Sequence, residues 1–247
     1  MIFAITSGSS ALDYFVIILL TLVAVCVSLV LHEVAHGLVA LWNGDPTAKF
    51  AGRLTLNPMK HFDIIGFIMM MLVGFGYAKP VPVNPYNFKH RTRGQVTVAI
   101  AGVTVNLILA FISSLFVCLM VLALNHATTD GTARLCWYAY QFFFILTSIN
   151  LSLLFFNIIP VFPLDGFRLI EALTRRGNRF CAFMRTNGQY ILWGLVGLSF
   201  IVSSAAARVS LPFWFEYLDI LGTYLNFFVT KLFNLFTSFW GLMVPIY

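Results

Sequence analysis

Residues 28–38 read Ser-Leu-Val-Leu-His-Glu-Val-Ala-His-Gly-Leu and carry a metal-binding pattern inside an apolar stretch. On a helix, His32 and His36 are four residues apart and share one face, so both imidazoles can reach one zinc ion while Glu33 projects beside them. The pattern therefore predicts two zinc ligands and a general base on one helix.

The surrounding sequence places this pattern within a membrane. Residues 14–31 carry no charge, which fits a transmembrane helix of about 20 residues. We expect the helix to cover residues 11–42, with Ser9 or Ser10 as its cap and Asn-Gly-Asp-Pro at 43–46 ending it. The motif then lies about 12 Å inside that end, below the membrane surface. Ionisable groups there are costly and favour a functional role, the alternative being polar residues packed at a helix end.

The composition supports a membrane protein. The chain has 247 residues, 60% hydrophobic and 10% charged, and its mean hydropathy is +0.90. These values exclude an ordinary soluble domain and indicate an all-α polytopic protein surrounded by the lipid bilayer. A net charge of +6 can indicate nucleic-acid binding, but Lys and Arg lie between apolar segments, so no nucleic-acid partner is expected. The four cysteines show no metal-ligand spacing and are interpreted as packing residues.

The apolar segments predict about five or six transmembrane helices with a short insertion. Residues 64–76 are apolar but short, which favours a re-entrant or interfacial hairpin over a full crossing. Residues 52–57 and 80–85 alternate like short strands, although prolines restrict the second to an edge strand or extended loop. The insertion is therefore expected to be re-entrant or β-hairpin-like. Beyond the first helix, helical segments are predicted at about 95–124, 133–156, 189–206 and from about 213.

Basic residues predict the orientation. The loops at 43–62, 77–94 and 167–186 hold 12 of the 15 Lys and Arg residues. By the positive-inside rule these loops face the cytoplasm, so the N-terminus lies outside a multi-pass protein of the cell membrane. The metal pattern is then nearer the cytoplasmic side.

A catalytic zinc generally has three protein ligands and a water, so a third ligand is expected. Most acidic residues lie at helix ends or in loops, and Asp165 is the candidate besides Glu33. Pro160 and Pro163 interrupt an apolar helix before Asp165, and Gly166 permits a sharp turn. Asp165 can thus reach the metal from a second helix, or it merely caps a short helix beginning at Gly166.

These residues carry a family resemblance. The stretch His32-Glu33-Val-Ala-His36-Gly37, with Asn157-x-x-Pro160-x-x-Pro163-Leu-Asp165-Gly166, resembles the site-2 protease family of intramembrane zinc metalloproteases. Residues 57–63, 75–85 and Ala101-Gly102-x-x-x-Asn106 resemble its compact bacterial and archaeal branch, which lacks a regulatory domain. The resemblance covers roughly residues 28–175. One departure is Val103, where the family usually has proline.

The resemblance implies one zinc ion per chain, held by His32, His36 and Asp165. Glu33 is then the general base, and Asn157 has an oxyanion or substrate-orienting role. A single integral-membrane metalloprotease domain is expected over residues 1–247, with a catalytic core at about 11–175 and C-terminal helices at about 187–247. It would hydrolyse peptide bonds within or near transmembrane segments of other proteins.

Two other functions are considered. A pseudoprotease would keep zinc and bind client helices without cutting, but Glu33 is unnecessary for structural zinc. A metal-ion transporter would need acidic groups continuing across the membrane, whereas the polar set converges on one place. The strand-like segments could hold an extended substrate by strand addition, or form a plain surface hairpin. The natural substrate and the oligomeric state cannot be read from the sequence.

Overall fold

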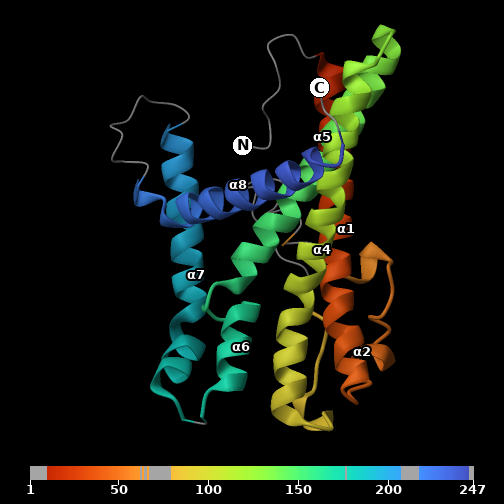
Figure 1. The fold of residues 1–247 in the computed structure, drawn as a ribbon. Helices are drawn as coiled ribbons and strands as arrows, with labels where there is room; N and C mark the ends of the chain where they lie inside the picture. Colours follow the sequence, from red (N-terminus) through yellow and green to blue (C-terminus); the bar gives the residue numbers. More distant parts are fainter. Residues whose placement is uncertain are drawn as a thin grey trace. The chain divides into compact units, whose positions relative to one another are not determined.

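The computed structural model describes residues 10–61, 63, 66, 79–175, 177–206 and 217–244. Within these ranges the regular structure is helical and includes no strand, which confirms the predicted all-α class (Figure 1). The elements in chain order are α1 (Ala11–Trp42), α2 (Thr47–Phe50), η1 (Pro58–Lys60), η2 (Pro85–Asn87), α4 (Arg91–Asn125), α5 (Asp130–Ile158), α6 (Asp165–Leu173), α7 (Arg179–Ala206) and α8 (Ile220–Gly241).

Four of the described helices are long and apolar enough to cross a membrane, namely α1, α4, α5 and α7. The chain is therefore a multi-pass membrane protein. The predicted count of five or six crossings also used residues 64–76, which lie outside the described residues except for Gly66, and the last apolar segment, where α8 lies. That count stays a prediction.

Some of the observed helices begin before their apolar stretches, whereas α8 begins at Ile220, later than the predicted start at about 213. The bounds of α1 match the prediction, but α4 begins at Arg91 and α7 at Arg179, earlier than residues 95 and 189. Main-chain hydrogen bonding continues through the basic residues that precede each apolar stretch, and hydropathy alone does not detect this.

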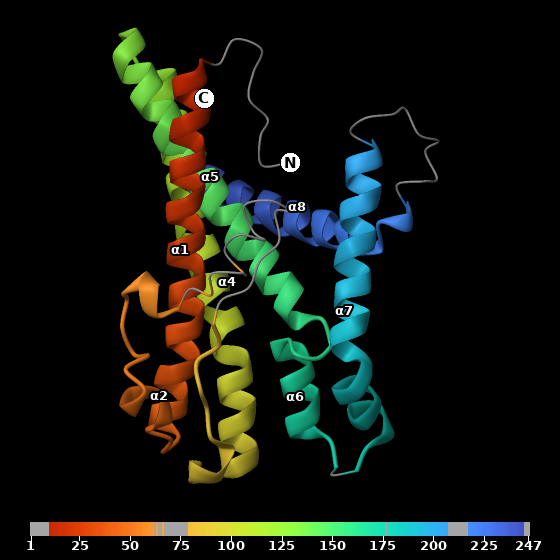
Figure 2. The ribbon, with the colours of Figure 1, turned by 180° about the vertical axis from the view of Figure 1, so that it is seen from behind.

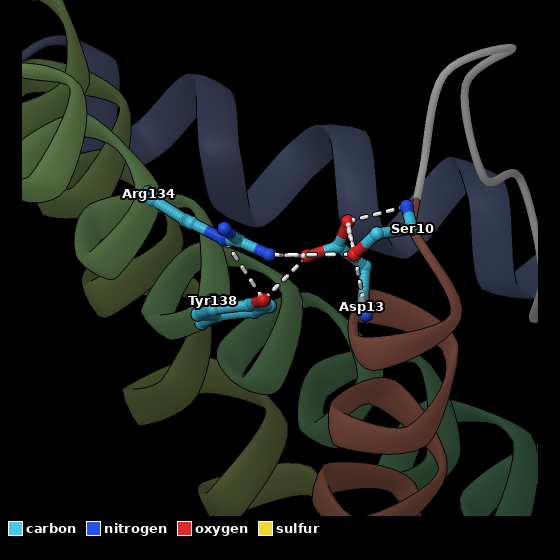
Figure 3. A network of polar contacts seen from close by, with 4 residues as sticks. All are labelled: Ser10, Asp13, Arg134 and Tyr138. Carbon is cyan, nitrogen blue, oxygen red and sulfur yellow. Dashed lines mark hydrogen bonds and ion pairs between the residues drawn. The ribbon is translucent and has the colours of Figure 1, made fainter.

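The start of α1 is capped as predicted and tied to α5. Ser10 Oγ accepts a hydrogen bond from the Asp13 N–H at 3.3 Å, and the Asp13 carboxylate accepts one from the Ser10 N–H at 2.7 Å. From α5, Arg134 Nη2 lies 2.7 Å from Asp13 Oδ1, and the Tyr138 hydroxyl donates to the same oxygen (Figure 3). The Arg134 side chain is 50% exposed, so this ion pair contributes less than a buried one would.

The described residues divide into two compact units, one within residues 1–29, 106–153 and 229–247, the other within 30–105 and 154–228. In the first unit, Ile17 and Ala24 of α1 pack on Ile145 and Leu146 of α5. Two buried polar contacts join helices there: Asn150 Nδ2 donates to Ser28 Oγ, and Ser113 and Thr147 hydroxyls meet at 2.8 Å. Such contacts between small polar residues are common between membrane helices.

The second unit contains the predicted metal pattern. Here the C-terminal part of α1 and the N-terminal part of α4 lie side by side, as do α6 and the start of α7 (Figures 1 and 2). Ala40, Val98 and Phe88 form a core between the first pair. Arg185 Nε lies 2.5 Å from Glu171 Oε1, which joins the second pair.

The loop after α1 is held by a fully buried carboxylate. Asp45 accepts hydrogen bonds from the Thr47 hydroxyl and N–H, from the Asn84 N–H at 2.6 Å and from Asn87 Nδ2 at 2.8 Å. Burial opposes ionisation, but these hydrogen bonds outweigh it and lower the pKa of Asp45 below its ordinary value. Asp45 thus joins the end of α1 to the segment that leads into α4.

The predicted strand-like segments are not strands in the described structure. Residues 52–57 and 80–84 are irregular, and 85–87 form the 3-10 turn η2. Within 79–84, the N–H groups of Lys79, Val81 and Asn84 donate to His61 O, Glu33 Oε2 and Asp45 Oδ2, and residues 80 and 82 are prolines. This part of the predicted β-hairpin-like insertion is wrong, because its donors are bound elsewhere or absent. The re-entrant alternative at 64–76 lies outside the described residues.

Candidate metal centre

The C-terminal half of α1 carries both histidines on a buried face. His32 is 6% exposed and His36 is 4% exposed. Their rings meet edge to face, with centroids 4.7 Å apart. The four-residue spacing of the α-helix accounts for this arrangement.

Asp165 reaches this pair from the first residue of α6. Its Oδ2 atom lies 3.3 Å from His32 Nε2 and 3.1 Å from His36 Nε2, and the two Nε2 atoms are 3.1 Å apart. Tetrahedral zinc, with bonds of about 2.0–2.2 Å, separates its ligand atoms by about 3.3–3.6 Å. The three side chains therefore form a triangle close to the size that zinc requires.

The main chain of α4 sets the protonation of His36. Its Nδ1 lies 2.7 Å from the Val98 carbonyl oxygen, which can only accept, so Nδ1 carries the hydrogen. In the neutral ring, Nε2 of His36 then has a lone pair that faces Asp165 Oδ2. This carboxylate oxygen is also an acceptor, and it has no hydrogen bond within the described residues. Two acceptors at this distance repel each other, and a cation between them removes that repulsion.

The donor set fits zinc. Two imidazole nitrogens and one carboxylate oxygen are ligands of catalytic zinc sites, which keep a further position for water. Calcium and magnesium prefer oxygen ligands throughout, so the paired nitrogens disfavour them. The second oxygen of Asp165, Oδ1, lies 3.6 Å from Arg168 Nη1, which leaves Oδ2 directed at the histidines.

Glu33 lies beside the histidines on α1 but outside the ligand triangle. Its Oε2 accepts a hydrogen bond of 2.8 Å from the Val81 N–H. Its Oε1 has no hydrogen-bond partner among the described residues and is free to accept a proton from water. The loop segment 79–84 thus orients the predicted general base.

Gly102 of α4 lies directly against the two rings. A Cβ atom at this position would be 2.4 Å from His32 Cε1 and 2.5 Å from His36 Nε2. Real Cβ atoms do not come this close to other heavy atoms, so any side chain here would displace the rings. Glycine at position 102 therefore allows α4 to pack directly against the two candidate ligands.

Two further positions singled out in the sequence, Asn157 and Val103, line a cavity with Asp165. Asn157 lies near the end of α5 and shares a cavity of about 190 Å³ with Asp165. Val103, where proline was expected, also lines this cavity. Asn157 is therefore near the candidate ligand Asp165 without belonging to the ligand triangle.

The alternative role of Asp165 as a helix cap is wrong. α6 begins at Asp165 itself, and its N-cap is Leu164, without a side-chain cap hydrogen bond. Gly166 is needed for a reason other than the predicted sharp turn: a Cβ there would lie 2.1 Å from the Ile158 carbonyl oxygen. The close approach of α6 to the end of α5 thus depends on glycine.

Three supporting groups were missed by sequence reasoning. The Val98 carbonyl and the Val81 N–H are main-chain groups, for which side-chain identity offers no signal. Arg168 follows Asp165 by three residues, a helical spacing that was visible in the sequence.

Comparison with known proteins assigns the family. Residues 20–202 match the family model described as Peptidase family M50. The chain is 41% identical over 204 residues to "Putative zinc metalloprotease YwhC" of Bacillus subtilis (strain 168), covering 76% of this chain and 87% of that protein.

More distant relatives are longer than the matched region. "Putative zinc metalloprotease Rip2" of Mycobacterium tuberculosis (strain H37Rv) is 30% identical over 149 residues, which cover 59% of this chain and 53% of that protein. The Rip2 protein of Mycolicibacterium smegmatis is 27% identical over 165 residues, which cover 65% of this chain and 59% of that protein. No solved structure matches the chain significantly. The family match and the YwhC relationship, together with the His-His-Asp group, show that this chain belongs to peptidase family M50.

Proposed function

We propose that this chain is an intramembrane zinc metalloendopeptidase that hydrolyses peptide bonds within or near transmembrane segments of other membrane proteins. One observation carries the proposal: His32, His36 and Asp165 converge within a membrane protein while Glu33 stands beside them with one free oxygen. Membership of peptidase family M50 and the names of the relatives support the same chemistry.

His32, His36 and Asp165 would hold one zinc ion per chain. When bound, zinc supplies a Lewis acid that polarises a peptide carbonyl and activates water. Glu33 accepts the water proton at Oε1 while the Val81 N–H holds Oε2 in place. The same carboxyl can then pass the proton to the leaving amide nitrogen. Val98 keeps the lone pair of His36 on Nε2, the atom that faces the metal position.

Asn157 is proposed to orient the substrate. It shares the cavity beside Asp165, and its side-chain amide can donate a hydrogen bond to a peptide carbonyl or to the developing oxyanion. A helical substrate must unwind locally, because its carbonyls are otherwise bonded within the helix. A substrate strand could pair with residues 79–84 mainly through their carbonyl groups. The N–H groups of Lys79, Val81 and Asn84 already have acceptors, residues 80 and 82 are prolines, and only the N–H of Val83 is left in this segment.

The orientation and domain organisation are part of this proposal. By the positive-inside rule, the basic loops support a metal centre nearer the cytoplasmic face of the cell membrane, with the N-terminus outside. We further propose one membrane-embedded protease domain, with its catalytic core at about residues 11–175. Cytoplasmic water would then reach the site.

Glu33→Gln tests the mechanism, because the amide keeps the shape of the side chain but cannot accept the proton. We expect this variant to bind stoichiometric zinc and to cleave a panel of transmembrane substrates at least 100-fold more slowly, within the range of about 10²–10⁴ for general-base catalysis. Glu171→Gln is the matched control, since Glu171 pairs with Arg185 outside the metal centre. Membrane-fragment proteomics of cells carrying each variant identifies natural substrates.

The rival functions give other results in the same experiment. Equal cleavage by the native protein and Glu33→Gln contradicts the role of Glu33. Binding of client helices by both without cleavage of any substrate favours a pseudoprotease. Zinc flux into liposomes that is abolished by His32→Ala favours transport.

A further inference from the structure

A groove of about 700 Å³ lies between α1 and α4, and of its lining residues only Ile100 also lines the cavity beside Asp165. Its size falls within the range of about 300–1,000 Å³ typical of small-molecule sites. Both helices turn one face to it at intervals of three or four residues, from Ala35 to Trp42 in α1 and from Arg93 to Val105 in α4. The walls of the groove are therefore regular helix faces, while the loop residues Asn43, Lys89 and His90 line it where α1 ends and α4 begins.

The two ends of the groove differ in character. Lys89, His90, Arg93 and the 72%-exposed Trp42 lie at the end where α4 begins. Leu38, Ile100 and Val105 line the groove further along the helices. None of the described lining residues is acidic, and Lys89 and Arg93 form no ion pair with any described residue. The basic end has a positive charge without a partner in this part of the chain.

The length of the groove matches one leaflet of a bilayer. At about 1.5 Å per residue, Arg93 and Val105 lie about 18 Å apart along α4. One leaflet contributes about 15 Å of the hydrocarbon core. Trp is favoured at the interface, where Trp42 and the basic residues would then lie, with the apolar walls extending inward.

The geometry points to a binding site for one anionic phospholipid, with its phosphate at Lys89 and Arg93 and an acyl chain between α1 and α4. Free phosphate would leave the apolar length unfilled, and a zwitterionic lipid would gain less from the basic end. Basic pockets between membrane helices on the cytoplasmic side bind anionic head groups. Ala35 and Ala101 in the groove wall precede His36 and Gly102, so the lipid would support the backbone that carries the metal centre.

Trp42 provides the probe. The protein is placed in phosphatidylcholine nanodiscs that contain a small fraction of brominated phosphatidylglycerol or brominated phosphatidylcholine, and the signal of Trp42→Phe is subtracted. We expect saturable quenching with a preference for phosphatidylglycerol. Each basic residue near an anionic head group raises the affinity for an anionic lipid about fivefold. Lys89→Gln/Arg93→Gln should therefore lower the ratio of the phosphatidylglycerol affinity to the phosphatidylcholine affinity about thirtyfold, or to one if the native ratio is smaller than that.

Two further variants keep the test decisive. Lys49→Gln/Lys60→Gln removes the same charge from residues that do not line the groove and should leave the preference unchanged. Thr104→Phe fills the apolar part without adding a fluorophore that the assay detects and should abolish saturable quenching with the charges intact. Equal quenching by both lipids in the native protein, or an unchanged preference in Lys89→Gln/Arg93→Gln, overturns the proposal. Displacement of the quencher by a transmembrane peptide or by a second copy of the chain, with no lipid preference, assigns the groove to that occupant instead.

Discussion

Replacing Gly102 with alanine should disable the metal centre through one added methyl group. The new Cβ would lie 2.4 Å from His32 Cε1 and 2.5 Å from His36 Nε2. Carbon contacts are optimal at about 3.5–4.0 Å, so the rings or α4 must move by about 1 Å. A site of this kind needs its side chains placed to within about 0.5 Å. The displacement is therefore about twice what the metal geometry tolerates.

The expected effect is large for activity and small for folding. A misplacement of about 1 Å can lower a reaction rate about 100-fold. Overpacking lowers the free energy of unfolding by about 1–3 kcal/mol. The better helix propensity of alanine offsets about 1 kcal/mol of this loss. We expect zinc affinity, measured by chelator competition, and cleavage of a transmembrane substrate to fall together. The thermal unfolding temperature should change little.

Gly197→Ala is the matched control. Gly197 lies in another transmembrane helix, α7, and a Cβ at this position would meet no heavy atom within 4 Å. It should keep native zinc affinity and cleavage and gain stability from helix propensity. The reasoning is refuted if Gly102→Ala is folded and retains both zinc affinity and cleavage rate within about twofold of the native protein, since the rings would then have room that the structure does not show.

Three further predictions concern other residues. Asp165→Ala should lose stoichiometric zinc, as metal analysis of the purified protein will show; full retention removes Asp165 from the ligand set. Thr92→Cys, made after removal of the native thiols, should react with membrane-impermeant reagents from the cytoplasmic side, and labelling from outside alone overturns the orientation. Asp45→Asn should lower stability by about 1–3 kcal/mol at neutral pH, measured by thermal unfolding. Folding lowers the pKa of Asp45, so its carboxylate contributes fully to the free energy of unfolding above the unfolded pKa of about 4. This contribution is lost as the pH falls towards the folded pKa. The stabilities of the native protein and Asp45→Asn should therefore converge in acid.

The sequence was sufficient for features that depend on local periodicity. The uncharged run, Ser10 and the Asn-Gly-Asp-Pro end were enough to predict α1 at residues 11–42, because apolar length, capping and helix termination are local properties. The four-residue spacing placed His32 and His36 on one face for the same reason. Asp165 followed from the scarcity of acidic residues within apolar segments, since a charge at that depth is costly.

Other features required the tertiary structure. The segments at 52–57 and 80–85 alternate like strands, yet the N–H groups of Val81 and Asn84 are donated to Glu33 and Asp45 from α1 and the loop after it. Alternation records which residue types recur, but not where each main-chain donor finds its acceptor.

The support of the metal centre was also decided by tertiary contacts. The Val98 carbonyl selects the tautomer of His36, the Val81 N–H holds Glu33, and Gly102 leaves the space that the two rings occupy. Two of these are main-chain groups and the third is a missing side chain, so residue identity alone does not reveal what they do. Their roles arise when α4 and the 79–84 segment pack against α1, which brings groups distant in the chain within hydrogen-bond or van der Waals distance.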